Sequence, residues 1–363
     1  MNLRNIQYPF LFEVPVLKHM AGFAGLLKRD PRGWPSDRPV VGMFLCLDPL
    51  IFCCQPQPRP FGVAHHLATR FPDETFVFLV PITMSLERRV NALALAAQHR
   101  RFQKTHPRAS LIILANTRDE ERLLRRLGVD VRYAPQNMFV DEGMYHPIPG
   151  RERRFDAIYN AQLAPFKRHE LARTLPSCAY VTKMFTTWSP QLKRQHLGKF
   201  VCSLPYNHVI LNDVTADDVV PMDHVKVNRA MASAHVGLCL SGLEGAMYAS
   251  IEYLLAGLPV VSTRSRGGRD VFFHPDTTLI VDDDPRAVQD GVVAMKARAL
   301  PPDYVRATTL RLIAEERAHF NVFIDGLRGR QVDRTDPRWS FEYAHKLARF
   351  GSISEFEALV RAR

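Results

Sequence analysis

The sequence predicts an α/β protein made of two doubly wound domains. Its 363 residues are enough for two separate hydrophobic cores. In both halves, short apolar runs rich in β-branched residues alternate with segments of helical spacing. A polar, proline-containing segment at 135–149 separates the two halves. Strands that alternate with helices favour parallel sheets with right-handed crossovers.

The first half contains candidate strands and helices in regular alternation. A loop rich in proline, from Pro49 to Pro60, follows the first strand, and Gly62 begins the next helix. We expect strands at 40–47, 76–81, 110–115 and 129–134, and helices at 63–71, 86–104 and 118–127. The first two strands would then flank one βαβ unit.

The second half repeats the alternation after the segment 135–149. We expect strands at 155–160, 179–182, 200–203, 208–211 and 279–281, and helices at 167–175, 225–234, 285–300, 302–323 and 339–362. A further βαβ unit lies between the helix at 225–234 and the strand at 279–281. It has a strand at 236–240, a helix at 245–256, a stop at Gly257 and a strand at 258–262.

Two acids lie on this last βαβ unit, with seven residues between them. Glu244 precedes the expected helix and Glu252 lies two turns into it, so both carboxylates are expected near the carboxyl edge of the sheet. That edge is where open α/β sheets bind ligands. Carboxylates can accept hydrogen bonds from sugar and ribose hydroxyls, while the amides of Gly245 and Ala246 can face a phosphate. The pattern is typical of a site for a nucleotide sugar.

The same residues resemble those of the family-four retaining glycosyltransferases. The matching positions are Ser241, Glu244-Gly245, Glu252, the string AGLPVV at 256–261, and Gly267-Gly268. The resemblance implies the GT-B architecture: two Rossmann-like doubly wound domains that face a central cleft, with a C-terminal helix that crosses back to the first domain. The expected divisions are an extension at 1–38, an acceptor domain at 39–149, a donor domain at 150–325 and a returning helical segment at 326–363.

The resemblance also implies roles for individual residues. Glu252 would hold the donor ribose, Glu244 the hydroxyls of the donor sugar, and Lys167 with Arg168 the diphosphate. Ser241, Gly245, Ala246, Gly267, Gly268 and, in the first domain, Gly62 would line the donor site. The family has a Gly-Arg pair before the lysine, where this chain has Asn160-Ala161, so either Arg168 replaces that arginine or the leaving group is less stabilised.

Histidine is the least determined part of the expected site. The family commonly places one in the first domain near the reacting sugar, but no motif marks it in this chain. His65 and His146 are the candidates that we carry forward as catalytic residues, and a structural role is the alternative for each.

Composition restricts the partners and the compartment. The formal charge of +11 favours anionic partners such as nucleotide diphosphates or acidic lipids. We expect no metal or other cofactor, no nucleic-acid partner and a cytoplasmic location. Leu17 to Lys28 has a lysine-flanked apolar helical face. We expect this helix to pack on its own domain, and peripheral contact with an anionic membrane is the alternative. The six cysteines show no metal-type spacing and are expected to be reduced thiols.

These observations predict a glycosyltransferase that moves a sugar from a nucleotide sugar to a glycan, a lipid-linked acceptor or another hydroxyl acceptor. Synthesis of a cell-surface polysaccharide or glycoconjugate is the expected context. Three alternatives remain: a sugar-nucleotide epimerase of the same fold, a non-catalytic sugar-nucleotide-binding protein, and a glycosyltransferase that modifies DNA. The sequence contains no G-x-S-x-G, G-x-x-x-x-G-K-[ST] or H-E-x-x-H motif, which argues against the enzymes that these motifs mark.

Overall fold

The computed structural model describes residues 39–55, 61–186, 188–329 and 344–363. The chain forms two compact units, one of Met1–Phe139 with Glu315–Arg363 and one of Val140–Ala314. The expected helix at 17–28, with the whole extension 1–38, lies outside the described residues. No helix among the described residues has the length and apolar character needed to cross a bilayer.

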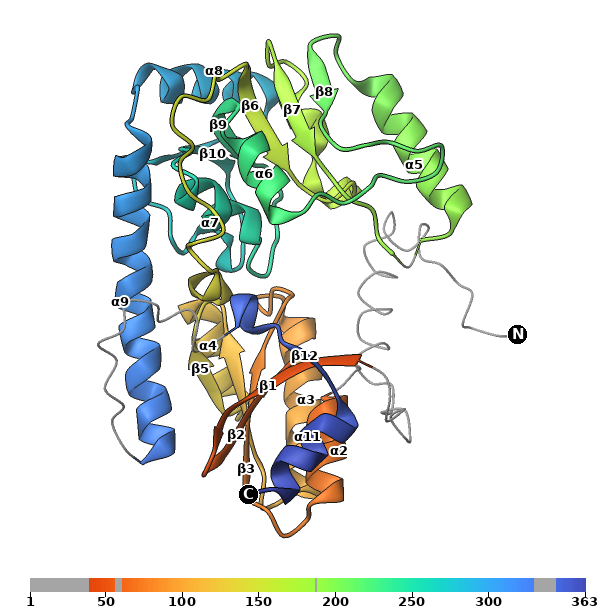
Figure 1. The fold of residues 1–363 in the computed structure, drawn as a ribbon, viewed down its shortest axis with the longest axis vertical. Coiled ribbons are helices and arrows are strands. Elements are labelled where there is room, and N and C mark those ends of the chain that lie inside the picture. The colour runs from red at the N-terminus through yellow and green to blue at the C-terminus, as the bar shows by residue number, and fades with distance from the viewer. Residues whose placement is uncertain (1–38, 56–60, 187, 330–343) are drawn as a thin grey trace. The chain divides into compact units, whose positions relative to one another are not determined.

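The first unit is built on a six-stranded sheet of order β12-β1-β2-β3-β4-β5 (Figure 1). Its strands are β1 (Pro39–Leu47), β2 (Leu50–Cys54), β3 (Phe76–Pro81), β4 (Ser110–Ala115), β5 (Val131–Tyr133) and β12 (Phe350–Ser352). Its helices are α2 (Gly62–Arg70), α3 (Arg89–Thr105), α4 (Arg118–Arg126) and α11 (Ile353–Arg361), with 3₁₀ turns η3 (Gln136–Phe139) and η7 (His345–Leu347). The helix α9 (Pro302–Arg328) continues from the second unit into the first.

Two features of this sheet differ from the prediction. The chain turns back at Asp48-Pro49 into β2, which pairs antiparallel with β1, and it is β2 that pairs parallel with β3. The βαβ unit is therefore β2-α2-β3, because the apolar run Leu50–Cys54 is a strand and not part of a proline-rich loop. The expected helix 339–362 is confirmed only over α11. Residues 339–343 lie outside the described residues, 345–347 form the turn η7, and 350–352 form β12 antiparallel to β1.

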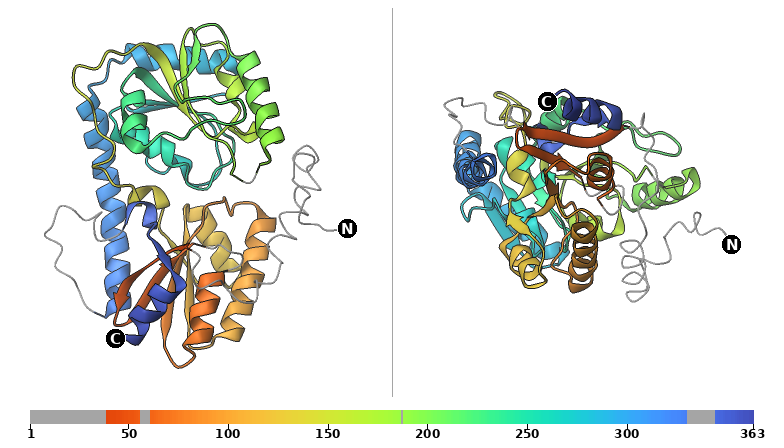
Figure 2. Two further views of the ribbon diagram at one scale, coloured as in Figure 1. Left: turned by 45° about the vertical axis from the view of Figure 1, so that its right-hand side comes forward. Right: turned by 90° about the horizontal axis from the view of Figure 1, so that it is seen from below.

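The C-terminal segment completes the core of the first unit. α11 begins at a capping box in which the Ser352 hydroxyl accepts the Glu355 N–H. Its Phe356 ring lies 5.0 Å from the ring of Phe52 on β2. Figure 2 shows α11 lying against β1. The return of the C-terminal helix to the first unit, expected from the resemblance, is confirmed.

The second unit is built on a six-stranded sheet of order β11-β10-β9-β6-β7-β8, in which every described pairing is parallel. Its strands are β6 (Phe155–Asn160), β7 (Cys178–Val181), β8 (His208–Ile210), β9 (Ala234–Cys239), β10 (Val260–Thr263) and β11 (Thr278–Val281). Its helices are α5 (Pro190–Ser203), α6 (His224–Met231), α7 (Tyr248–Leu255) and α8 (Pro285–Ala297). Numbered from β6, this is the 3-2-1-4-5-6 strand order of a Rossmann sheet.

Two predictions in the second unit are wrong. Residues 200–203 are the last turn of α5 and not a strand, because Ser189 caps that helix and Pro190 occupies its first turn. Residues 167–175 do not form an α-helix. They contain the 3₁₀ turns η4 (Pro165–Lys167) and η5 (His169–Ala172), separated by Arg168 in the left-handed region at φ 53°.

Most other elements agree with the prediction to within a few residues. β3, β4 and β6 have the expected bounds. Gly257 ends α7 at φ +75°, where a Cβ atom would lie 2.6 Å from Pro302 Cβ, so only glycine fits this close approach. The βαβ unit that contains Glu244 and Glu252 is confirmed as β9-α7-β10.

Candidate functional site

The strand order of the second unit places one ligand-binding edge. β6 and β9 are neighbours, and the chain leaves them toward opposite ends of the sheet, β6 toward β7 and β9 toward β10. Such a topological switch point leaves a crevice at the carboxyl ends of the two strands, and ligands of open α/β sheets bind there. The two loops at this point are 161–177 and 240–247, which contain Lys167 and Glu244.

Lys167 and Glu244 form an ion pair at this switch point. Only 10% of the lysine side chain and 11% of the glutamate side chain are exposed. The backbone holds Lys167 in place, because the hydroxyl of the buried Tyr159 on β6 donates to its carbonyl oxygen at 2.6 Å. Two opposite charges in such a poorly hydrated place interact strongly, and a bound anion would compete for the same ammonium.

Glu252 lies in the middle of α7 and is 5% exposed. Its carboxylate accepts a hydrogen bond from the Asn160 side-chain amide at 3.4 Å. The Tyr145 hydroxyl also donates to it, and burial followed by this carboxylate raises the pKa of Tyr145. The end of β6 and the loop after it therefore contact both predicted glutamates, Glu252 through Asn160 and Glu244 through Lys167.

Tyr253 on α7 positions the backbone of Asn160. Its hydroxyl accepts the backbone N–H of Asn160, and its ring is fully buried against β9. A Cβ atom at Gly237 would lie 2.5 Å from this ring, so glycine is what lets the ring lie on the strand. The sequence analysis missed Tyr145 and Tyr253, because neither belongs to the motif that marks the glutamates.

The loops after β9 and β10 are joined by backbone hydrogen bonds. Glu244 N donates to Arg266 O at 3.0 Å, and Gly268 N donates to Gly245 O at 2.6 Å. Gly267 has φ +95°, which few other residues adopt. The predicted donor-site residues Glu244, Gly245, Gly267 and Gly268 thus come together in one structure.

Ser241 and Ala246 lie in the same loop and are buried. The Ser241 hydroxyl is directed at the sulfur of Met247, 3.8 Å away. α7 begins at Tyr248, three residues later than the expected start at Gly245. Gly245 and Ala246 therefore belong to the loop that leads into the helix.

Arg269 is a buried side chain whose structural role the sequence does not indicate. It directly follows the Gly267-Gly268 pair and is fully buried. Its guanidinium donates to acceptors at the ends of β9 and β10 and to the next residue, namely Cys239 O, Ser241 O, Ser262 Oγ, Thr263 O and the Asp270 carboxylate. It fastens the carboxyl ends of both strands together, and no spacing in the sequence distinguishes it from the exposed Arg264.

Arg168 is also tied to the strand ends. Its guanidinium donates to Leu240 O at 2.5 Å, Thr263 Oγ1 at 2.8 Å and Asp283 Oδ2 at 2.6 Å. It lies so close to Gly242 that a Cβ atom there would be 3.4 Å from Nη1. Arg168 is therefore adjacent to the site, with its donors directed at protein acceptors.

Neither histidine candidate makes one of the contacts described above. His146 is exposed in the loop before β6, where its backbone N–H and C=O both bond the Asn228 side chain, at 3.3 and 3.0 Å. His65 is on α2 of the first unit, with its Nδ1 2.9 Å from Nε2 of His106, and Gly62 is the first residue of that helix. Burial, with the neighbouring His106 and Arg101, lowers the pKa of His65 to about 4.

No family model and no curated protein matches this sequence. Solved structures do match. Sucrose-phosphate synthase from Thermosynechococcus elongatus is 15% identical at a TM-score of 0.50, over 73% of this chain and 68% of that one. Anabaena HepE, solved in complex with UDP and glucose, is 10% identical at a TM-score of 0.53, over 73% and 75%. TarM is 12% identical at a TM-score of 0.52, over 76% of this chain and 54% of that one.

The chain has the GT-B fold. Identities of 10–15% establish the fold alone, so function depends on the site. The expectation of two Rossmann-like units is confirmed by both the sheets and these matches.

Proposed function

We propose that this GT-B protein is a retaining glycosyltransferase that uses a nucleotide-sugar donor. The observation that carries the proposal is the convergence of Lys167, Glu244 and Glu252 at the switch point of the second unit. A cation and two carboxylates at this edge suit a ligand that has both phosphates and hydroxyls. HepE has been solved with UDP, which makes uridine nucleotides the first donors to test.

Each of the three residues has a distinct role in the proposal. Glu252 accepts hydrogen bonds from the ribose hydroxyls, and Lys167 neutralises the diphosphate. When the diphosphate approaches Lys167, it competes with Glu244 for the ammonium. The Glu244 carboxylate can then accept hydrogen bonds from hydroxyls of the donor sugar. The loop residues Ser241, Gly245, Ala246, Gly267 and Gly268 line the donor.

The reaction is a displacement on the donor face from which the nucleotide leaves. The bond between the anomeric carbon and the diphosphate oxygen breaks, and a bond from the acceptor oxygen to that carbon forms. The acceptor's proton passes to the departing phosphate oxygen. Lys167 stabilises the charge on that phosphate in a nearly dry place, where such stabilisation is strongest. The proposal requires no metal ion, and activity should persist in excess EDTA.

The acceptor in this proposal is a hydroxyl of a glycan or a lipid-linked saccharide, used to make a cell-surface polysaccharide or glycoconjugate. Its site of action is the cytoplasm, with peripheral contact at the inner face of the membrane. The positive charge of +11 supports an anionic surface as the place where such an acceptor is met. Sedimentation with anionic but not with neutral vesicles at low salt would agree with this location.

A donor screen tests the proposal. A nucleotide sugar that binds should raise the melting temperature, since a ligand of the folded state stabilises by RT ln(1 + [L]/Kd). Proton NMR of the product from an α-linked donor should then show an α-linkage, whereas a β-linkage would exclude the retaining mechanism. Donor conversion without any acceptor would favour an epimerase. Binding without transfer would favour a non-catalytic protein, and transfer to DNA would favour a DNA-modifying glycosyltransferase.

A further inference from the structure

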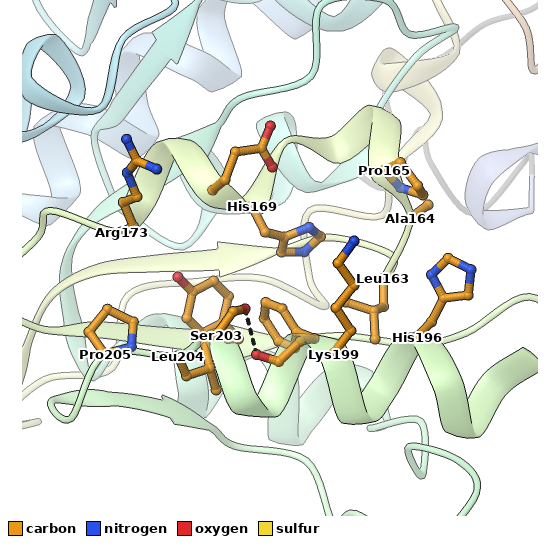
Figure 3. Close-up of a pocket in the computed structure, with 13 residues that line it drawn as sticks. Leu163, Ala164, Pro165, His169, Arg173, His196, Lys199, Ser203, Leu204 and Pro205 are labelled. Atoms are coloured by element: carbon orange, nitrogen blue, oxygen red, sulfur yellow. Dashed lines mark hydrogen bonds between the residues drawn. The ribbon is translucent and has the colours of Figure 1, made fainter. Parts of the chain in front are cut away.

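The connection from β6 to β7 contains no α-helix, and a cavity lies where one would pack. Residues 161–177, all of which the structure describes, form only the turns η4 and η5. The next connection has the 14-residue α5, which buries only Leu197 and Phe200. Between η5, β7 and α5 is a cavity of about 590 Å³, within the range of small-molecule sites (Figure 3).

This cavity is distinct from the donor site. It is lined by Leu163, Ala164 and Pro165 of the loop after β6, by residues of η5 and by one face of α5. Lys167, Glu244 and Glu252 are not part of its wall. The wall also includes the aromatic side chains of Tyr180 on β7 and Phe200 on α5, whose ring centroids are 5.2 Å apart.

His169 in the wall has an unused hydrogen-bond acceptor. Its Nε2 makes no hydrogen bond, and the residue is only 9% exposed. Its other ring nitrogen donates to the carbonyl of Ala161, and burial together with the charge of Lys167 lowers its pKa to about 3. The ring is therefore neutral, and its Nε2 can accept a hydrogen bond. A buried polar atom without a partner destabilises the folded protein, and a ligand hydroxyl that donates to it would remove that cost.

The rim of the cavity has two cations without carboxylate partners. Among the described residues, neither Lys199 nor Arg173 forms an ion pair, whereas Lys193 and Arg194 on the same helix pair with Asp218 and Asp217. In Figure 3 the Lys199 side chain extends from α5 toward His169. Glu170 is the single acid in the wall, so the cavity has a net positive charge.

We propose that this cavity binds a phosphorylated sugar or polyol, as a second ligand site of the second unit. The phosphate would meet Lys199 and Arg173, and a hydroxyl would donate to Nε2 of His169. The C–H face of the sugar would pack on Phe200 and Tyr180. A bare phosphate would fill a small part of the volume and leave the aromatic wall uncovered. The binding of nucleotide at the switch point is not required for this site.

The experiment titrates the full-length protein with glucose 6-phosphate, mannose 6-phosphate and glycerol 3-phosphate, followed by calorimetry and saturation-transfer NMR. Inorganic phosphate and glucose are titrated separately as the two halves of a ligand. We expect at least one phosphorylated compound to bind about tenfold more tightly than either half. Saturating UDP should leave that affinity unchanged.

Variants locate the binding. Lys199→Gln and Arg173→Gln change exposed side chains and should fold normally, yet each should weaken the ligand about fivefold or more. His169→Phe keeps the aromatic wall and removes the acceptor, so it should weaken the sugar phosphate and leave inorganic phosphate unaffected. Arg194→Gln, on the same helix but outside the wall, is the matched control.

Four results would overturn the proposal: no binding of any of the three compounds at millimolar concentration, equally tight binding of inorganic phosphate, displacement by UDP, or wild-type affinity in Lys199→Gln. Failure of the protein to bind any nucleotide sugar would contradict the proposed transferase function and leave this site intact.

Discussion

Lys167 and Glu244 are 77 residues apart in sequence and form an ion pair from which water is largely excluded. In the unliganded protein each side chain is the counter-ion of the other. A diphosphate changes this balance, because it supplies a second anion for the lysine. Binding of a phosphate at Lys167 would therefore make the Glu244 carboxylate available to accept hydrogen bonds from the sugar.

The first prediction concerns this pair. Lys167→Met should weaken binding of the nucleoside diphosphate about tenfold or more and leave the corresponding nucleoside unaffected, because only the phosphates meet the ammonium. Calorimetry with UDP and uridine measures both. Lys296→Met removes another ion pair of the second unit, with Asp156, and is the control. Equal UDP affinity in Lys167→Met and wild type would place the phosphates elsewhere.

The same variant leaves a nearly buried Glu244 carboxylate without its cation. Removing one partner of such a pair is more damaging than removing both. The double variant Lys167→Met, Glu244→Gln should therefore unfold at higher denaturant concentration than Lys167→Met alone. Glu244→Gln alone should retain nucleotide binding and lose sugar transfer.

The second prediction concerns Glu252. Glu252→Ala should weaken nucleotide binding by about 1.5–3 kcal/mol, the range for a hydrogen bond to a charged group. The loss should vanish for a 2′,3′-dideoxy nucleotide, which lacks the hydroxyls that the carboxylate accepts. Asp290→Asn, an exposed acid on α8, provides the control. An unchanged affinity, or an equal loss for the dideoxy nucleotide, would contradict the ribose role.

The third prediction is about stability. Arg269→Lys should lower the free energy of unfolding by about 2–4 kcal/mol, because an ammonium cannot reach the acceptors on two strands that the planar guanidinium bonds. Chemical denaturation measures the change. Arg264→Lys, a neighbouring exposed arginine, should alter stability very little. If the two variants are equally stable, Arg269 does not fasten the strand ends.

The fourth prediction follows from the lowered pKa of His65. Its ordinary pKa near 6.5 applies in the unfolded chain, while the folded value is about 4. Below pH 6.5 the unfolded state binds the proton first, so stability falls as pH drops toward 4 and is independent of this group above 6.5. His65→Phe removes the titration.

Melting temperatures between pH 7.5 and 4.5 test this dependence. The wild-type protein should lose more stability over that interval than His65→Phe does, since only the wild type has the His65 contribution. Parallel curves for the two proteins would show that burial of His65 has no effect on stability.

The elements were predictable where local signals were strong. Gly257 ended α7 as expected, and the β-branched runs of β3, β4 and β6 had the expected bounds. The strands β2 and β12 were missed because each depends on pairing with β1. The local sequence of β2, a short apolar run between prolines, does not indicate that partner. The helix expected at 167–175 failed because Arg168 adopts φ 53°, which contacts with distant strand ends stabilise.

The candidate site shows the same division. The spacing of Glu244 and Glu252 marked both acids, and the residue types indicated a ligand with hydroxyls and phosphates. Their partners could not be read from spacing, since Tyr145 and Asn160 reach Glu252 only through the folded sheet. Arg269 shows the limit most clearly, because its acceptors at the end of β9 lie close to those at the end of β10 only when the two strands pair.

The contribution of β12 and α11 to the first unit also has a consequence for biosynthesis. The second unit is formed by one continuous stretch, so its residues are all made before residues 315–363, which the first unit needs. Until those residues emerge, β1 lacks its outer neighbour and Phe52 lacks the ring of Phe356. An uncovered strand edge is a surface on which nascent chains associate. We therefore expect the first unit to be the later of the two to complete its core, because its last strand and helix are made after the whole of the second unit.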